Sequence, residues 1–306
     1  MDKKRVQAYI ELLIVAAIWG IAGPIIKFAL PEFPPFIFLT YRFFISVLIL
    51  LPIYLVLKPK FPSSTREKII LTIVGLTGST INLALTFYGF KYTSVLDAIL
   101  IGNTSPLFVV VGGAIFLKEK ISKREKLGII IAFLGTLTII FEPEFVSSLS
   151  DHRLLGNFLI ILANLCWVVY VLLSKNELKH RVNALTMTTY MFILGFFTSL
   201  PVAIYQSGGF SNLLIHIATS SIPAHLSVWY MAVLSGSLAY FLYQKGQKSI
   251  EASEATLFGY LGPIFAAPLA VFWLKEKITI PFIIGAVIIA IGVYIAEKKS
   301  KGVDST

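Results

Sequence analysis

The chain has 306 residues, of which 57% are hydrophobic and 14% are charged, and its formal net charge is +10. Soluble domains carry about 25% charged residues, because water must solvate their exterior, so this composition excludes a soluble globular protein. The basic residues fall in short runs between apolar segments without interleaved aromatic residues. We therefore expect contact with a lipid bilayer and no nucleic-acid partner.

Apolar stretches of about 20 residues recur along the chain, which is the length that a helix needs to cross a bilayer core of about 30 Å. The predicted fold class is an all-α integral membrane protein with ten transmembrane helices. We place them at 11–30, 36–57, 69–90, 94–117, 125–141, 157–175, 184–205, 226–245, 252–274 and 280–297. The longest connection, 206–224, contains apolar residues that predict a short helix at the interface.

The basic residues are distributed unequally between the two sides of these predicted helices. With a cytoplasmic N-terminus, 20 of the 26 Lys and Arg residues lie in cytoplasmic segments and four lie in outer segments, while Lys27 and Arg42 lie inside helices. Positive charge concentrates on the cytoplasmic side of membrane proteins. The bias predicts a multi-pass protein of the cytoplasmic (inner) membrane with both termini in the cytoplasm.

The two halves of the sequence resemble each other. At an offset of 157 residues, Asp97–Ala98 falls on Glu254–Ala255, Pro106 falls on Pro263, and the run 117–121 falls on the identical run 274–278. At an offset of 148, Trp19 and Lys27 fall on Trp167 and Lys175, and at 149, Tyr41 falls on Tyr190. We infer two related units, residues 1–146 and 147–306, each with five of the predicted helices.

The odd number of helices in each unit has a consequence for mechanism. The second unit must enter the membrane in the opposite orientation, which gives a 5+5 inverted repeat. Such repeats provide two near-equivalent conformations, each open to one side, with a binding site between the halves. The pattern therefore predicts alternating access, and the alternative is a duplicated membrane scaffold that transports nothing.

The repeated pattern resembles the EamA-type family of the drug/metabolite transporter superfamily, over essentially the whole chain. The residues that carry the resemblance are Asp97–Ala98, Pro106, Leu117–Lys118–Glu119, Gly128 and Gly135, their counterparts from Glu254–Ala255 to Gly292, Trp19, and Tyr41–Arg42–Phe43. The resemblance implies that each half is one EamA-type unit. It also implies secondary transport without ATP hydrolysis, and export of amino acids, metabolites or drugs.

The sequence itself gives no sign of a cofactor or of catalysis. It contains no Gly-x-x-x-x-Gly-Lys-Ser/Thr loop for a nucleotide and no Gly-x-Ser-x-Gly nucleophile motif. The four histidines fall in predicted loops without metal-ligand spacing: His152, His180, His216 and His225. We therefore expect a protein that is not an enzyme and has neither cofactor nor metal.

The expected function is secondary active or facilitative export of amino acids or related small organic metabolites. Two alternatives stay open, which are exchange of anionic or phosphorylated metabolites and a non-transporting scaffold. The expected partners are a small-molecule substrate and the lipid bilayer. Proton coupling and the choice between monomer and homodimer also stay open.

Charged residues at membrane depth are energetically costly, so each of them is a candidate for a functional role. Arg42 either pairs with Asp97 or binds a carboxylate or phosphate of the substrate. Asp97 and Glu254 begin equivalent helices, where they either favour the helix dipole or couple transport to protons. Lys27 lies close enough to a helix end to reach water, and Glu119 and Glu276 are expected to hold loops between helices.

Polar and aromatic residues near the middle of the predicted helices are the candidates for a substrate cavity. These residues are Trp19, Asn82, Asn103, Asn164, Trp167, Tyr170, Tyr240 and Tyr260. Each polar group must find a partner helix or a wet cavity, because an unsatisfied amide in lipid costs several kcal/mol. A shared cavity of this kind is largely apolar and aromatic, which suits amphipathic substrates of medium size.

The repeated prolines Pro106 and Pro263 lie in the middle of predicted helices. Proline removes one backbone hydrogen bond and kinks a helix. Both simple packing and bending during gating explain such a kink.

Overall fold

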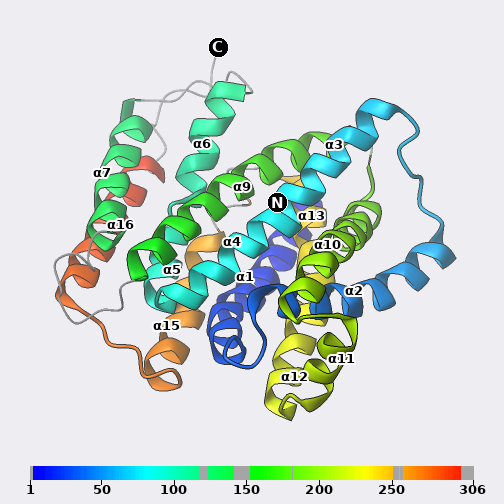
Figure 1. Cartoon of the computed structure of the whole chain (residues 1–306). Coiled ribbons are helices and arrows are strands. Elements are labelled where there is room, and N and C mark those ends of the chain that lie inside the picture. Colours follow the sequence, from blue (N-terminus) through cyan, green and yellow to red (C-terminus); the bar gives the residue numbers. More distant parts are fainter. Residues whose placement is uncertain are drawn as a thin grey trace.

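The computed structural model describes residues 3–116, 123–140, 152–180, 182–250, 255 and 258–297. This described part is helical and contains no strand (Figure 1). Seven helical stretches are long and apolar enough to cross a membrane, and four shorter apolar helices accompany them. The prediction of an all-helical, multi-pass membrane protein is confirmed at this level.

The elements follow one another as a series of helices joined by short connections. In chain order they are α1 (Lys3–Ala29), α2 (Pro35–Leu57), α3 (Thr65–Gly75), η1 (Leu76–Thr80), α4 (Ile81–Tyr92), α5 (Val95–Gly102), α6 (Ser105–Phe116), α7 (Lys123–Ile140), α9 (Arg153–His180), α10 (Ala184–Gln206), α11 (Phe210–Thr219), α12 (Ile222–Trp229), η2 (Tyr230–Leu238), α13 (Ala239–Ser249), η3 (Phe258–Leu261), α15 (Gly262–Phe272) and α16 (Ile280–Glu297).

The segment predicted as a helix over 94–117 forms one apolar span, Val95–Gly113, but the chain turns within it at Asn103 and Thr104, between α5 and α6. Pro106 follows the turn, and its missing N–H cannot bond the carbonyl one turn earlier. A carbonyl near the C-terminal end of α5 finds local hydrogen-bond donors. Ile101 O accepts from the backbone N of Thr104 at 3.1 Å and from its Oγ1 at 2.7 Å.

The second predicted proline helix, 252–274, also differs from expectation. The 3₁₀ turn η3 precedes α15, and Pro263 lies in the first turn of α15, where a missing N–H costs no helical bond. Residues 251–254 and 256–257 lie outside the described part, so the start of this segment has no structural account.

Two long helical stretches contain π-helical segments at matching positions. η1 lies between α3 and α4, and η2 lies between α12 and α13. The residues 157 positions after η1, 233–237, all lie inside η2. A π segment replaces i→i+4 hydrogen bonds with i→i+5 bonds and is often found at functional sites. Here a carbonyl of each segment accepts a hydrogen bond from an aromatic side chain.

Two antiparallel helix pairs each join a helix of the first half of the chain to a helix of the second half. α2 lies against α10, where Thr40 Oγ1 donates to Ser199 Oγ at 3.0 Å and the rings of Phe43 and Phe192 lie 5.7 Å apart. α7 lies against α16, and a methyl group at Gly135 would lie 2.9 Å from the carbonyl oxygen of Gly285. Glycine therefore permits this close crossing.

The two repeat-related lysines make the same contact in the two halves. Lys27 of α1 donates to the carbonyls of Phe90 and Thr93 at the end of α4, at 2.6 and 2.5 Å. Lys175 of α9 donates to the carbonyls of Gln247 and Ile250 at the end of α13. Lys27 thus satisfies a helix terminus, and the expectation that it simply reaches water was incomplete.

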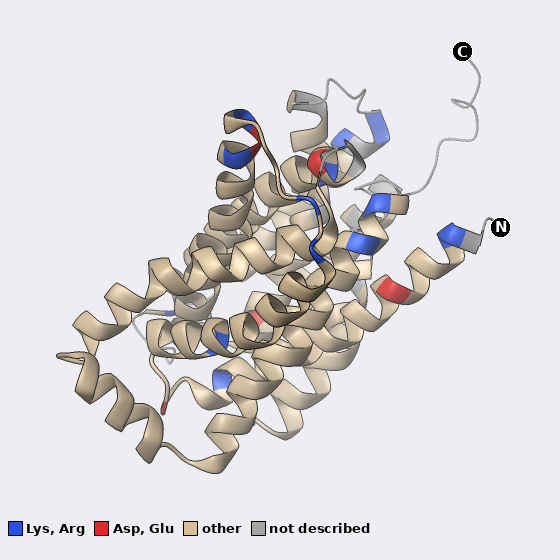
Figure 2. Ribbon diagram, turned by 90° about the vertical axis from the view of Figure 1, so that its right-hand side faces the viewer, with Lys and Arg blue, Asp and Glu red and all other residues tan. Residues whose placement is uncertain are grey.

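Apolar side chains face outward as well as inward. Val56, Phe272 and Ile280 expose 79%, 75% and 74% of their surface, which suits hydrocarbon rather than water. Most Lys and Arg segments lie in the upper and right-hand parts of Figure 2, and few lie at the lower left. Charge is thus unevenly distributed, as the sequence predicts.

The connection 206–224 forms the short helix α11 as predicted. Ser221 after α11 donates its backbone N and its Oγ to the Glu32 carboxylate, at 2.7 and 2.6 Å, and these bonds lower the pKa of Glu32. His180 is the last residue of α9, and His216 and His225 lie inside α11 and α12, so the assignment of these three histidines to loops is wrong. Among the described residues, no group of three potential ligands could hold a metal.

Candidate functional site

A cavity of about 320 Å³ lies between elements from both halves of the chain. Its wall combines α1, α2, α4, α5 and α6 with α9, η2, α13, η3 and α15. Most lining residues are apolar or aromatic, with a few amide and hydroxyl groups among them. This size and lining are typical of a small-molecule site.

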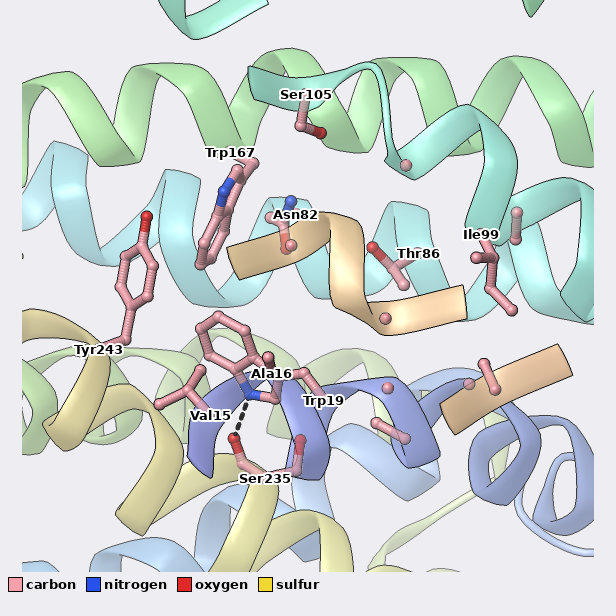
Figure 3. A pocket seen from close by; sticks show the side chains of 18 of the residues that line it. Val15, Ala16, Trp19, Asn82, Thr86, Ile99, Ser105, Trp167, Ser235 and Tyr243 are labelled. Carbon is pink, nitrogen blue, oxygen red and sulfur yellow. Dashed lines mark hydrogen bonds between the residues drawn. The ribbon is translucent and has the colours of Figure 1, made fainter. Parts of the chain in front are cut away.

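An aromatic cluster forms one end of the cavity. The rings of Trp19 and Trp167 meet edge to face with centroids 5.4 Å apart, and Tyr243 lies 5.3 Å from each. Tyr240 lies 5.2 Å from Trp19. Figure 3 shows the two indoles pointing toward one another from opposite walls, with Tyr243 beside them. These rings offer flat apolar faces to a ligand.

The π segments orient two of these aromatic residues. Trp19 Nε1 donates to Ser235 O of η2 at 2.9 Å (Figure 3), and the Tyr240 hydroxyl donates to Gly78 O of η1 at 2.9 Å. Gly78 and Ser235 are 157 residues apart, so their carbonyls occupy equivalent repeat positions. The two widened turns therefore supply the acceptors that a polar aromatic side chain needs in an apolar wall.

Two of the predicted asparagines both line the cavity and connect helices. Asn82 Nδ2 donates to Ala163 O of α9 at 2.7 Å, and Asn164 Nδ2 donates to Ile101 O at the break after α5 at 3.0 Å. No described residue donates to either amide oxygen. Each asparagine thus joins helices through its N–H₂ group and presents an acceptor at the cavity wall.

Arg42 of α2 also lines the cavity and is fully buried, with an exposed fraction of 0%. None of its three side-chain nitrogens has a hydrogen-bond partner among the described residues. The predicted pairing of Arg42 with Asp97 is wrong. Asp97 instead accepts two bonds from Arg153, with Oδ2 2.7 Å from Nε and Oδ1 2.7 Å from Nη2.

The Asp97–Arg153 pair belongs to a polar cluster beyond one end of the cavity. Thr93 Oγ1 donates to Asp97 at 3.2 Å, and the Thr93 carbonyl accepts from Lys27. Glu276 accepts from the backbone N of Val95 and Leu96, at 2.7 and 3.0 Å, and so caps α5. Burial raises the pKa of the Glu276 carboxyl, although these two bonds oppose the shift.

The structure brings most of the predicted cavity residues together. Trp19, Asn82, Asn103, Asn164, Trp167, Tyr240 and Arg42 all line the cavity. Tyr170 does not, because it is fully buried behind Trp167, with ring centroids 4.8 Å apart, and its hydroxyl accepts from Gln244 at 3.2 Å.

Some predicted residues have no side-chain account. Glu254 and Glu119 lie outside the described residues, and the side chains of Pro106 and Tyr260 lie outside them as well. Pro263 is described but does not line the cavity. The roles assigned to these residues stay predictions.

Sequence reasoning missed Thr86, Ser105, Ser235 and Tyr243, which also line the cavity. A signal was present for Tyr243, which lies three residues after Tyr240 and so shares its helix face. Ser235 contributes through its backbone, and no side-chain pattern reports a carbonyl.

Comparison with known proteins gives consistent matches over the whole chain. A sequence profile of the EamA-like transporter family matches twice, over residues 7–141 and 154–297. Two Bacillus subtilis (strain 168) proteins named uncharacterized transporters are similar: YetK is 27% identical over 99% of this chain and 90% of its own length, and YyaM is 29% identical over 96% and 94%.

More distant matches cover most of the chain as well. A WAT1-related protein of Arabidopsis thaliana is 26% identical over 92% of this chain and 82% of its own length. One solved crystal structure matches with a TM-score of 0.61 at 16% identity, covering 96% of this chain and 98% of its own. At that identity the structural match indicates a shared fold only.

Proposed function

Because the chain belongs to the EamA-like transporter family of the drug/metabolite transporter superfamily, we propose that it is a carrier that moves small organic molecules across the cytoplasmic membrane by alternating access. The observation that carries the proposal is the aromatic cavity of about 320 Å³, whose wall takes elements from both halves of the chain. Carriers bind their cargo between repeats near mid-membrane.

The proposed architecture is ten transmembrane helices in a 5+5 inverted repeat, with units 1–146 and 147–306. The seven long spans together with α7, α15 and α16 would make ten. Two repeated features support equivalence of the units. These are the π segments η1 and η2, and the lysine contacts of Lys27 with the end of α4 and of Lys175 with the end of α13.

The proposed orientation puts both termini in the cytoplasm. Its support is the count of 20 basic residues on that side of the predicted helices against four on the other. Trp19 and Tyr240 donate hydrogen bonds to carbonyls of the π segments, and π segments are often found at functional sites. We further propose that these segments rearrange as the cavity changes its accessible side.

The proposed cargo is an amino acid or a related small metabolite, and the proposed direction is export. Both follow from the family resemblance. The unpartnered Arg42 in the cavity wall favours the alternative in which an anionic metabolite is exchanged.

The test is uptake and counterflow in proteoliposomes with a mixed panel of amino acids and metabolites, with and without a pH gradient. We expect flux of at least one panel member. The double variant Trp19→Ala/Trp167→Ala should abolish it, because each indole contributes ring contacts to the cavity. Trp229→Ala is the matched control, since Trp229 is 49% exposed and does not line the cavity.

Two results would count against the proposal. Absence of flux for every panel member would remove the carrier function, and full flux in the double tryptophan variant would remove this cavity as its site. Proton coupling has a separate readout: flux that responds to the pH gradient in the native protein and loses that response in Asp97→Asn or Glu254→Gln.

A further inference from the structure

Arg42 is the one described residue whose charge lies in the cavity wall. The described lining contains apolar, aromatic, amide and hydroxyl residues and no carboxylate. The guanidinium packs against η2, where a methyl group at Gly236 would lie 3.3 Å from Nη2 of Arg42. Glycine at this position therefore leaves the room that the cation occupies.

The burial of Arg42 is not compensated by the described residues around it. Nε, Nη1 and Nη2 all lack a hydrogen-bond partner there. The guanidinium carbon lies 5.8 and 5.9 Å from the ring centroids of Phe43 and Phe87. Both distances are close to the outer limit of a cation–π contact, about 6 Å. Such contacts do not replace the hydrogen bonds that a desolvated charge needs.

The cation has no equivalent in the second half of the chain. The residue 149 positions later is Met191, whose sulfur accepts from Gln244 Nε2 at 3.3 Å. A residue needed only for helix packing would be expected in both halves of a symmetric fold. The asymmetry favours a role toward a ligand that has one charged end.

We propose that Arg42 binds the carboxylate of an organic anion whose apolar or aromatic body lies against Trp19, Trp167 and Tyr243, an inference that rests on the proposed function of this cavity as the transport site. The guanidinium offers parallel N–H donors that match a carboxylate. Since the side chain has no exposed surface, the carboxylate reaches it as the cavity wall opens locally around the cargo.

The single charge of the guanidinium matches a carboxylate better than a phosphate monoester. A phosphate monoester carries about −1.5 to −2 at pH 7, and a single guanidinium would leave part of that charge uncompensated in an apolar cavity. Among the described lining residues, a hydroxyl or amino group of the cargo would meet neutral acceptors, such as the amide oxygens of Asn82 and Asn164.

The experiment is calorimetric titration of the full-length protein in detergent with four probes that share one ring and differ in charge. The probes are 3-phenylpropanoate, phenylalanine, 3-phenylpropanamide and phenethylamine. We expect the two carboxylates to bind, and the neutral amide and the cationic amine to bind on the order of 100-fold more weakly, because they cannot accept the guanidinium's charge-assisted bonds.

Variants assign the effect to Arg42. Arg42→Gln should reduce carboxylate affinity by on the order of 100-fold, and Arg42→Lys should restore part of it by retaining the charge. Lys91→Gln is the matched control, because Lys91 is exposed at the end of α4 and outside the cavity. The ligand-free Arg42→Gln protein should be at least as stable as the native protein, whereas a structural arginine would leave the variant destabilised.

Equal binding of the amide and the carboxylate, failure of both carboxylates to bind, or unchanged carboxylate affinity in Arg42→Gln would overturn the inference. Proteoliposome flux separates it from the proposed function. Flux of a cationic or neutral cargo that is unaffected by Arg42→Gln would keep the carrier and reject the carboxylate site. Carboxylate binding that depends on Arg42 without any flux would keep the site and reject the carrier.

Discussion

Arg42 and Arg153 are both buried, yet their surroundings are opposite. Arg153, at the start of α9, is 7% exposed and makes two bonds of 2.7 Å to the Asp97 carboxylate. Arg42, inside α2, is 0% exposed and has no hydrogen-bond partner among the described residues. The same type of side chain thus forms a complete internal ion pair at Arg153 and lacks a partner at Arg42.

This difference concerns how the cost of burying each charge is offset. A buried ion pair contributes little net stability, but loss of one partner is severe because a charge is left in low dielectric. At Asp97 and Arg153 the chain supplies both partners, and helices α5 and α9 are held together. At Arg42 the second partner is absent from the described chain, which fits a contact that only a ligand completes.

The largest expected effect is on the closed pair. Asp97→Asn should lower the free energy of unfolding by about 3 kcal/mol, because the Arg153 charge stays buried without its carboxylate. Denaturation with SDS in mixed micelles measures this change. Arg42→Gln, measured in the same way without ligand, should cause no loss, and an equal loss in both variants would remove the distinction between the two arginines.

A second change should convert the open contact into a closed one. Ser46 lies one turn after Arg42, and its Oγ and Nη2 of Arg42 lie 3.2 and 3.3 Å from the position of a methyl group at Gly236. Ser46→Asp should supply an internal carboxylate and be more stable than Ser46→Asn by about 2 kcal/mol. It should also prevent 3-phenylpropanoate binding. Equal stability of the two variants, with binding intact, would contradict the assignment.

A third comparison concerns the repeat-related lysines. Lys27→Met and Lys175→Met should each cost about 1.5 kcal/mol, because each removes charge-assisted bonds to two carbonyls at a helix end. Equal losses in thermal and SDS unfolding would support equivalence of the halves. A large loss in one variant and none in the other would indicate that the shared contact is incidental.

The smallest expected effects are opposite pH dependences at two carboxyls outside the helices. Burial raises the pKa of Glu276 above its ordinary 4.5, so its contribution to stability falls as pH rises through the range just above 4.5. Hydrogen bonds from Ser221 lower the pKa of Glu32, so its contribution falls as pH drops below 4.5. The measurement is the melting temperature as a function of pH. Glu276→Gln should remove the loss of stability above pH 4.5, and Glu32→Gln should remove the loss below pH 4.5. A pH profile that is unchanged in both variants would contradict these pKa shifts.

The sequence by itself determined the membrane character, the approximate positions of the helices and the repeat. These follow from one-dimensional properties: the length of apolar runs, the sidedness of basic residues and identity at a fixed offset. It also identified Trp19, Asn82, Asn103, Asn164, Trp167 and Tyr240, because a polar or aromatic residue deep in an apolar run needs a special environment.

Only the tertiary structure decided which charges are paired and which faces converge. Asp97 lies 55 residues from Arg42 and 56 from Arg153, and nothing in the spacing favours one partner over the other. In a helix that is apolar on all sides, the sequence does not show which face points to the cavity. Tyr170 and Tyr240 therefore look alike in sequence, although only Tyr240 lines the cavity. Hydrogen bonding and burial are properties of the packed chain, and these left Arg42 as the cavity's unfilled contact.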